Sequence, residues 1–278
     1  MKAAIQRSRR RGAVPDAGSV GFSSSLRAFT IIELLVVLAV IAALTTLALP
    51  SIKNIRKANV MVSAGRQLVD DLGLARARAI SDRTTVHVIF VPPDIQGWLF
   101  PPGTTVQGQR DVKLAARLLS APYTTYALYA ERTVGDQPGR PQRRFITSWR
   151  TLPDGVFIAT NKFINNVTVR DSDLIPDHQR NFEYVSLPFP TVFGSQYEVP
   201  HIAFDAQGRL VDNKNNKIKF HTEVIPLARG SILYTRNGPN LVDFDVRETP
   251  PNNSVTNFHH VVVDSLTGRA RVETPQIQ

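Results

Sequence analysis

Residues that could do catalytic or metal chemistry are scattered through this 278-residue sequence and form no motif. It contains no Gly-x-Ser-x-Gly, no phosphate-binding P-loop, no His-Glu-x-x-His and no cysteine. His259 and His260 are adjacent, and on a strand they would point to opposite faces. We therefore expect no catalytic residue, no metal site and no cofactor, and we expect that the protein is not an enzyme.

Acidic residues cluster once, in the segment "DSDLIPD". Asp171, Asp173 and Asp177 offer the oxygen ligands that calcium prefers, but the segment lacks the glycine and the distal glutamate of an EF-hand loop. We expect a solvated acidic loop at this position.

Basic residues offer a second candidate near the C-terminus, in "GRAR". On a strand Arg269 and Arg271 would share one face, where two guanidinium groups could hold phosphates. Two phosphate contacts alone would give weak, salt-sensitive binding. The alternative is that Gly268 makes a hairpin turn and that the two arginines are an ordinary solvated pair.

Composition limits the remaining classes. The absence of cysteine excludes a disulfide framework, zinc–thiolate sites and thiol catalysis. The net charge is +10, but residues 1–28 hold six basic residues against one aspartate and so carry half of it. The rest of the chain is only modestly basic, which is weak evidence for an anionic partner.

One charged group stands inside an apolar segment, and it is the most informative residue of the sequence. Glu33 lies near the start of Phe29 to Pro50, whose 22 residues would form a helix about 33 Å long, against about 30 Å of bilayer hydrocarbon. The basic residues before it favour a cytoplasmic N-terminus. A charge in a membrane helix costs roughly 2.5–3.5 kcal/mol and usually marks a partner. The apolar run is rather long for a secretory signal cut near Thr46-Leu47-Ala48, and a plain signal anchor leaves Glu33 unexplained.

The stretch "RAFTIIELLVV" resembles the processing site of type IV prepilins and type II secretion pseudopilins. The resemblance implies cleavage between Ala28 and Phe29 by a prepilin peptidase, N-methylation of Phe29, and an assembly role for Glu33 at the fifth mature position. Pro50 matches the kinking proline of these helices, whereas Ala28 departs from the usual glycine. Cleavage would create an ammonium group four residues from Glu33, about one helical turn away. The family's glutamate is thought to meet the N-terminal amine of a neighbouring subunit.

The segment after Pro50 keeps a helical period, with apolar residues recurring at intervals of three and four up to Ile80. The pattern predicts a helix from Phe29 to about Ser81, some 80 Å long. Alternating and apolar runs then predict strands at 84–91, 124–133, 144–149, 201–205, 217–224, 231–235 and 258–264. Gly208 and Gly268 are expected to turn two late hairpins.

The segments "ARARAISDRTTVHVIF", "LPDGVFI", "IAFDAQGRL" and "VVVDSLTGRARVE" resemble, in order, those of GspH/FimT-type minor pseudopilins. The resemblance covers about half of the chain. Residues 92–123 and 161–200 are interpreted as insertion loops. In the FimT branch, which serves DNA uptake, a Gly-Arg-x-Arg element is linked with DNA binding, and this would give Arg269 and Arg271 a role in contacting DNA.

The resemblance predicts an α+β, pilin-like fold, in which a long N-terminal helix with an apolar half and an amphipathic half packs on an antiparallel β-rich head. The expected divisions are a cleaved leader (1–28), a transmembrane and assembly half-helix (29–50), an amphipathic half-helix (51–82) and the head (83–278).

The implied function is that of a minor pseudopilin of a type II secretion pseudopilus. Its implied location is the bacterial inner membrane, single-pass, with a cytoplasmic leader and a periplasmic head, and then the pseudopilus. Its implied partners are the prepilin peptidase, other pilins or pseudopilins, an inner-membrane assembly platform and, before assembly, the lipid bilayer. A FimT-like minor pilin that contacts DNA and a membrane-anchored β-rich binding domain remain as alternatives.

Overall fold

The structure is a computed structural model that describes residues 30–95, 113–114, 117–133, 136–137, 140, 142–165, 168, 174–212, 217–237, 240–256 and 259–274. Residues 47–59, 236–237 and 240–243 are described by their backbone alone. The chain divides into two compact units, Met1–Ile52 and Lys53–Gln278. The predicted leader, residues 1–28, lies outside the described residues.

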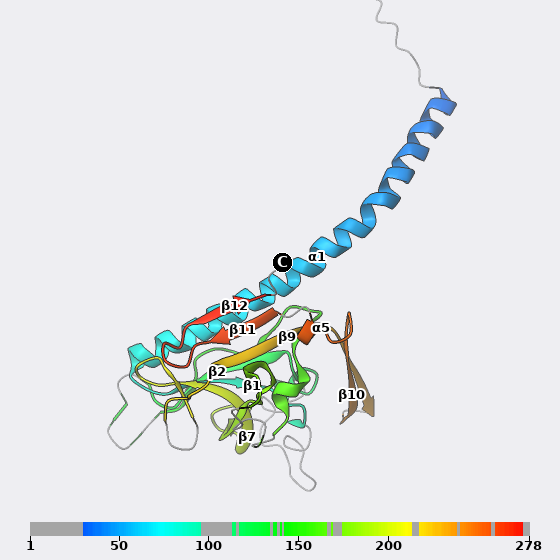
Figure 1. Cartoon of the computed structure of the whole chain (residues 1–278). Coiled ribbons are helices and arrows are strands. Elements are labelled where there is room, and N and C mark those ends of the chain that lie inside the picture. The colour runs from blue at the N-terminus through cyan, green and yellow to red at the C-terminus, as the bar shows by residue number, and fades with distance from the viewer. Residues whose placement is uncertain are drawn as a thin grey trace, which may run out of the picture. The chain divides into compact units, whose positions relative to one another are not determined.

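Helix α1 (Ile31–Asp82) precedes a series of strands (Figure 1). Val86–Phe90 (β1) is central in the first antiparallel sheet, whose order is β3-β2-β1-β7-β6, with β4 also on β2 and β8 on β7. The other strands of this sheet are β2 (Thr125–Ala130), β3 (Arg144–Phe145), β4 (Arg150–Thr151), β6 (Glu183–Phe189), β7 (Ser195–Phe204) and β8 (Leu210–Val211).

The second antiparallel sheet has the order β10-β9-β11-β12, with β5 also on β9. Its strands are β5 (Val156–Ile158), β9 (Glu223–Asn237), β10 (Asn240–Glu248), β11 (His259–Val263) and β12 (Ala270–Glu273). Short helical turns, η1 (Thr160–Phe163), η2 (Asp177–Gln179) and α5 (Asn253–Thr256), connect them.

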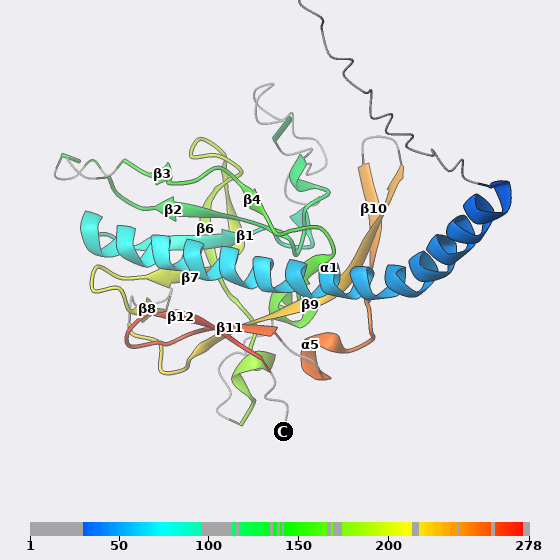
Figure 2. The same cartoon turned by 90° about the horizontal axis from the view of Figure 1, so that it is seen from above.

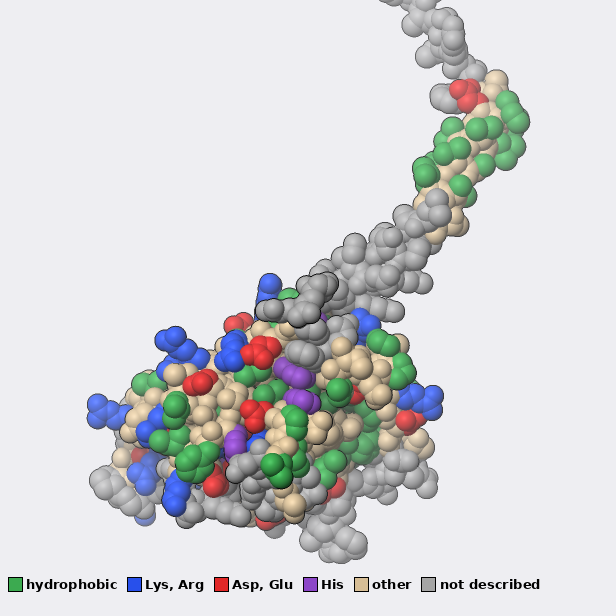
Figure 3. Space-filling model, in the orientation of Figure 1, with side chains coloured by type: hydrophobic (Ala, Val, Ile, Leu, Met, Phe, Trp, Pro, Cys, Tyr) green, Lys and Arg blue, Asp and Glu red, His purple; other side chains and the backbone are tan. Residues whose placement is uncertain are grey.

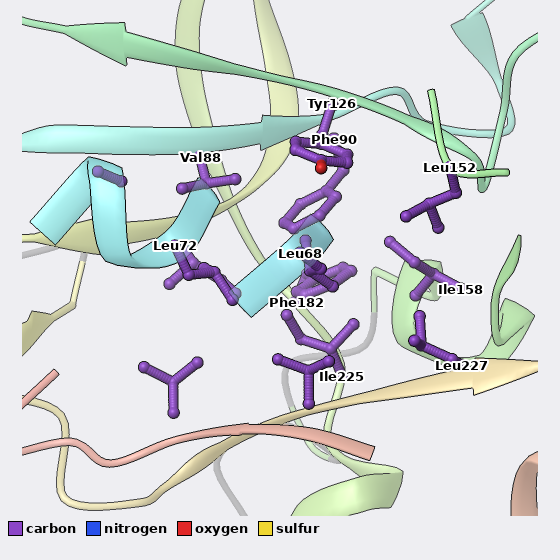
Figure 4. Packing of buried hydrophobic residues seen from close by; sticks show 14 of the residues in the cluster. Leu68, Leu72, Val88, Phe90, Tyr126, Leu152, Ile158, Phe182, Ile225 and Leu227 are labelled. Carbon is purple, nitrogen blue, oxygen red and sulfur yellow. The ribbon is translucent and has the colours of Figure 1, made fainter. Parts of the chain in front are cut away.

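The main hydrophobic core lies between the C-terminal part of α1 and both sheets (Figures 2 and 4). Leu68 and Leu72 of the helix are fully buried there. Alternate residues of β1, such as Val88 and Phe90, face this core, while Ile89 faces a second cluster on the other side of the sheet. Because both faces of β1 are covered by apolar clusters, the strand is apolar at almost every position.

Two hairpin turns meet against α1 at the end of this core. Gly208 and Gly268 both have positive φ, +78° and +61°, as turn glycines often do. The two hairpins pair β7 with β8 and β11 with β12, which confirms the expected turns. A Cβ on Gly268 would lie 1.9 Å from the carbonyl oxygen of Gly208, so the two turns are packed backbone against backbone. Arg76 of α1 donates a hydrogen bond from Nε to the Thr267 carbonyl, 2.6 Å away.

Other strand predictions were only partly right. β1, β2, β7, β9 and β11 overlap predicted strands. Of residues 144–149 only Arg144–Phe145 is strand, and 217–224 is strand only from Glu223. The interpretation of 161–200 as loop was wrong, because it holds β6 and the start of β7. Pro188 is tolerated because β6 is an edge strand of the sheet.

The predicted fold class is wrong as stated. The described part of the chain is mainly β and forms two antiparallel sheets. Among the described residues, α1 is the one helix of more than a few turns. The side-chain packing described between α1 and these sheets begins at Val60. The predicted α+β, pilin-like fold class is therefore contradicted, because the described residues are predominantly in antiparallel sheets.

The expected membrane span is also corrected. Within the described residues, no helix is both long and apolar enough to cross a bilayer. The predicted transmembrane half-helix and the single-pass inner-membrane location are therefore contradicted.

Candidate functional site

The predicted processing and assembly residues lie around the start of α1. Ala28 and Phe29 are outside the described residues. Glu33 lies in the first turn of the helix, where its backbone N–H donates to the Thr30 side-chain oxygen at 3.2 Å. Thr30 is therefore the N-cap of α1, a role that threonine commonly fills. A carboxylate in the first turn is favoured by the helix dipole, so Glu33 stabilises this helix start.

The side chains that follow Glu33 form an exposed apolar surface, here called the apolar stretch (residues 31–46) (Figure 3). Every residue in it is exposed, and Ile31 retains 82% of its accessible surface. Thr45 and Thr46 donate their hydroxyls back to main-chain carbonyls of the same helix, to Ile41 and Ala43 at 2.5 and 2.7 Å. The backbone of Pro50 is helical, and its side chain is outside the described set.

The later part of α1 is fixed to the first sheet by a buried polar cluster. The Tyr126 hydroxyl donates to Asp71 at 2.6 Å, and Arg150 forms an ion pair with the same carboxylate. Gln67 donates to the Tyr126 hydroxyl and to the Thr151 carbonyl, both at 3.1 Å. Burial, and then the bond to Asp71, raise the pKa of the Tyr126 hydroxyl, which therefore stays protonated and donates.

A second buried network lies in the head. Lys162 is fully buried, and its Nζ lies 2.7 Å from Glu223, which also accepts from Lys219 at 3.0 Å. The Nζ of Lys219 also forms an ion pair with the Glu183 carboxylate, 3.3 Å away. Burial raises the pKa of Glu223, but the charges of the two lysines outweigh it and hold this pKa at about 2. Burial lowers the pKa of Lys162, whose charge is stabilised by Glu223. The network joins η1, β6 and β9, and it serves to hold the fold together.

The histidines do not assemble a metal site. His260 is buried and donates to the Ser254 carbonyl at 3.2 Å, and its ring stacks on that of His178 at 5.5 Å. Burial is the main cause that lowers the pKa of His260, which keeps it neutral. In the part of the chain that the structure describes, no three ligand-type side chains converge as a metal site would require.

The acidic segment is described only in part. Asp171 and Asp173 lie outside the described residues, and Asp177 on η2 accepts from the Arg180 guanidinium at 3.0 Å. The ion pair gives Asp177 a local structural role.

The two candidate DNA-contacting arginines are exposed, but they are not equivalent. Arg271 lies on edge strand β12 and forms hydrogen bonds with Glu273 at 2.9 and 2.6 Å. Arg269 precedes the strand, and its backbone closes the hairpin by accepting from the Asp264 N–H at 3.1 Å. An exposed ion pair such as that of Arg271 contributes little in water, so the DNA interpretation of these two arginines stays a prediction.

Comparisons with protein-family models, with curated proteins and with solved structures return no match for this chain. The resemblance to GspH/FimT-type pseudopilins therefore rests on the sequence motifs alone.

Sequence reasoning missed both buried charge clusters. Asp71 and Arg150 are 79 positions apart, and Lys162 and Glu223 are 61 apart. Separations of this size leave no local pattern. The only local signal was that Asp71 is adjacent to Asp70 on a helix whose apolar face was already identified, and Asp71 is buried while Asp70 is exposed.

Proposed function

We propose that this chain is a subunit of a pilin-like filament, specifically a minor pseudopilin of a type II secretion pseudopilus, cut between Ala28 and Phe29 and assembled through its N-terminal helix. The observation that carries the proposal is the position of Glu33. A single carboxylate stands five residues from a matching cleavage site and opens a stretch of sixteen exposed residues.

Physical reasoning supports an assembly role for this stretch. An exposed contiguous apolar surface is unfavourable in water and usually marks an interaction site. Packing the apolar stretches of several copies together would remove this surface from water, at about 25 cal/mol per Å². The same packing would surround Glu33 with apolar groups, where an unpaired charge is costly.

The new amine at Phe29 supplies the missing partner. A charge pair in a low-dielectric environment is far stronger than in water, and a subunit joined in the wrong register would leave Glu33 unpaired. Glu33 therefore fixes register as well as affinity. The proposed partners are a prepilin peptidase, other pilins or pseudopilins and an assembly platform.

The head has a structural part in this proposal. Its two buried charge clusters are held in internal ion pairs, which stabilise the head. In this proposal the head is the part that the N-terminal helix brings into the filament.

Mass spectrometry of the chain isolated from cells with the matching peptidase tests the proposal. We expect the mature N-terminus at Phe29. An Ala28→Glu variant, which places a bulky charge at the cleavage site, should stay unprocessed, while Gly21→Glu should be cut normally. A mature chain that begins after Ala48, or one that retains Met1, would contradict the proposal.

A further inference from the structure

The head contains a cavity of about 820 Å³ that the proposed function does not use. It lies beside the β3–β4 edge of the first sheet, between residues 144–151, the loop 190–193 and the helical residues near Leu118. Leu114, Leu118 and Val192 belong to or pack on the second hydrophobic cluster, so the cavity has an apolar base. Its volume is within the 300–1,000 Å³ typical of small-molecule sites.

Aromatic rings form one wall of this cavity. Phe145 and Trp149 both line it, with their ring centres 5.6 Å apart. The Phe145 ring also packs against Tyr129, with ring centres 5.4 Å apart, and the Trp149 ring packs against Phe189, with ring centres 5.2 Å apart. Phe193 lies at the rim with 93% of its surface exposed. Such rings offer both faces and edges to another aromatic group.

The charge at the cavity is positive. Arg117 and Arg144 are the charged side chains among the described lining residues, and no carboxylate lines it there. The Arg144 guanidinium is 48% exposed, and its contact with Asp82 is long, at 3.7 Å. Arg117 is exposed as well. Guanidinium groups bind carboxylates and sulfonates with two parallel hydrogen bonds.

Two polar groups of the lining are already engaged within the protein. Trp149 donates to the Pro190 carbonyl at 3.2 Å, and the Thr147 hydroxyl accepts from the Leu128 N–H at 3.1 Å.

We propose that this cavity is a binding site for a small anionic amphiphile that has an aromatic body and a carboxylate head. The aromatic body lies against Phe145 and Trp149, and the carboxylate lies between Arg117 and Arg144 at the rim. The absence of lining carboxylates among the described residues selects against cationic ligands, because a cation would be desolvated beside two guanidinium groups.

Isothermal titration calorimetry on the full chain tests this with three probes of one shape: 2-naphthaleneacetate, its neutral amide 2-naphthaleneacetamide, and 2-(2-naphthyl)ethylamine. We expect the acetate to bind at least tenfold more tightly than the amide, and the amine to bind most weakly. Equal affinities for the three probes, or no heat from any of them at millimolar concentration, would overturn the proposal.

Matched variants locate the site. Arg117→Gln combined with Arg144→Gln should weaken acetate binding at least tenfold and leave the amide unchanged. Arg247→Gln, which removes an exposed arginine outside the cavity, should change neither. Ser148→Trp places bulk at an exposed lining position and should weaken both probes. Thermal unfolding confirms that each variant is folded, and full acetate affinity in the folded double variant would overturn the proposed site.

Discussion

Residues 31–46 and residues 60–82 belong to the same helix, α1, and their apolar side chains have opposite surroundings. The first stretch is almost wholly apolar, and every side chain in it is exposed. The second is more polar, yet Leu68, Leu72 and Ala75 are fully buried. Burial within the head therefore follows the spacing of the apolar residues, not their number, because only a stripe on one face fits against two sheets.

The largest difference is expected from leucine truncation in the two stretches. Leu68→Ala and Leu72→Ala should each lower the free energy of unfolding of the head by about 2–5 kcal/mol, because each leaves a cavity in the main core. Leu35→Ala and Leu38→Ala remove the same atoms from exposed positions and should change it by less than about 0.5 kcal/mol. Urea denaturation followed by circular dichroism checks this. Comparable losses in the two stretches would show that the apolar stretch is packed within the chain.

The next largest effect is a loss of stability at low pH, which we expect in the head and not in the apolar stretch. The pKa of Glu223 is about 2 in the folded head, against an ordinary 4.5. Its ionised form therefore stabilises the fold fully above pH 4.5, and this stability, on the order of 3 kcal/mol, is lost as the pH falls towards 2. Unfolding measured between pH 6 and 2 should show this loss, and Glu223→Gln should flatten it. An unchanged slope in that variant would contradict the role of Glu223.

A smaller effect is expected from two carboxylates of α1, the buried Asp71 and the exposed Glu33. Asp71→Asn removes the ion pair with Arg150 and weakens the bond from Tyr126, and should cost about 1–3 kcal/mol. Glu33→Gln should leave the stability of the head unchanged, because no side-chain partner in the described residues depends on it. Denaturant midpoints measure both. A loss in Glu33→Gln as large as in Asp71→Asn would refute the division of roles.

The smallest change concerns a glycine in the packed part of the helix. A Cβ on Gly73 would meet no atom within 4 Å, so Gly73→Ala should stabilise the head by about 0.5–1 kcal/mol. Gly268→Ala is the matched opposite, because its φ is +61° and its Cβ would collide with the Gly208 carbonyl. Thermal unfolding should therefore move in opposite directions for the two variants.

The sequence predicted local structure better than long-range structure. The helical period, the alternation of β1 and the turns at Gly208 and Gly268 depend on neighbouring residues, and these predictions were correct. The edge strand β6 was missed, because residues 161–200 were interpreted as an insertion relative to the family. β6 contains Pro188, which is tolerated because the strand lies at the edge of the sheet. The ion pairs of Asp71 and Lys162 join distant segments, so no spacing could indicate them. The expected membrane span was inferred from length and composition alone, and among the described residues no helix is long and apolar enough to cross a bilayer.

The central claim is that Glu33 and the apolar stretch assemble this chain into a filament. The most direct measurement is the amount of Glu33→Gln chain in the isolated filament fraction of cells that have the native machinery and lack the wild-type copy. The variant should be cut at Phe29 at the wild-type rate and be absent from filaments, because the amine at Phe29 then has no carboxylate partner. Asp70→Asn, an exposed carboxylate further along α1, should be incorporated normally. Wild-type incorporation of Glu33→Gln would contradict the account.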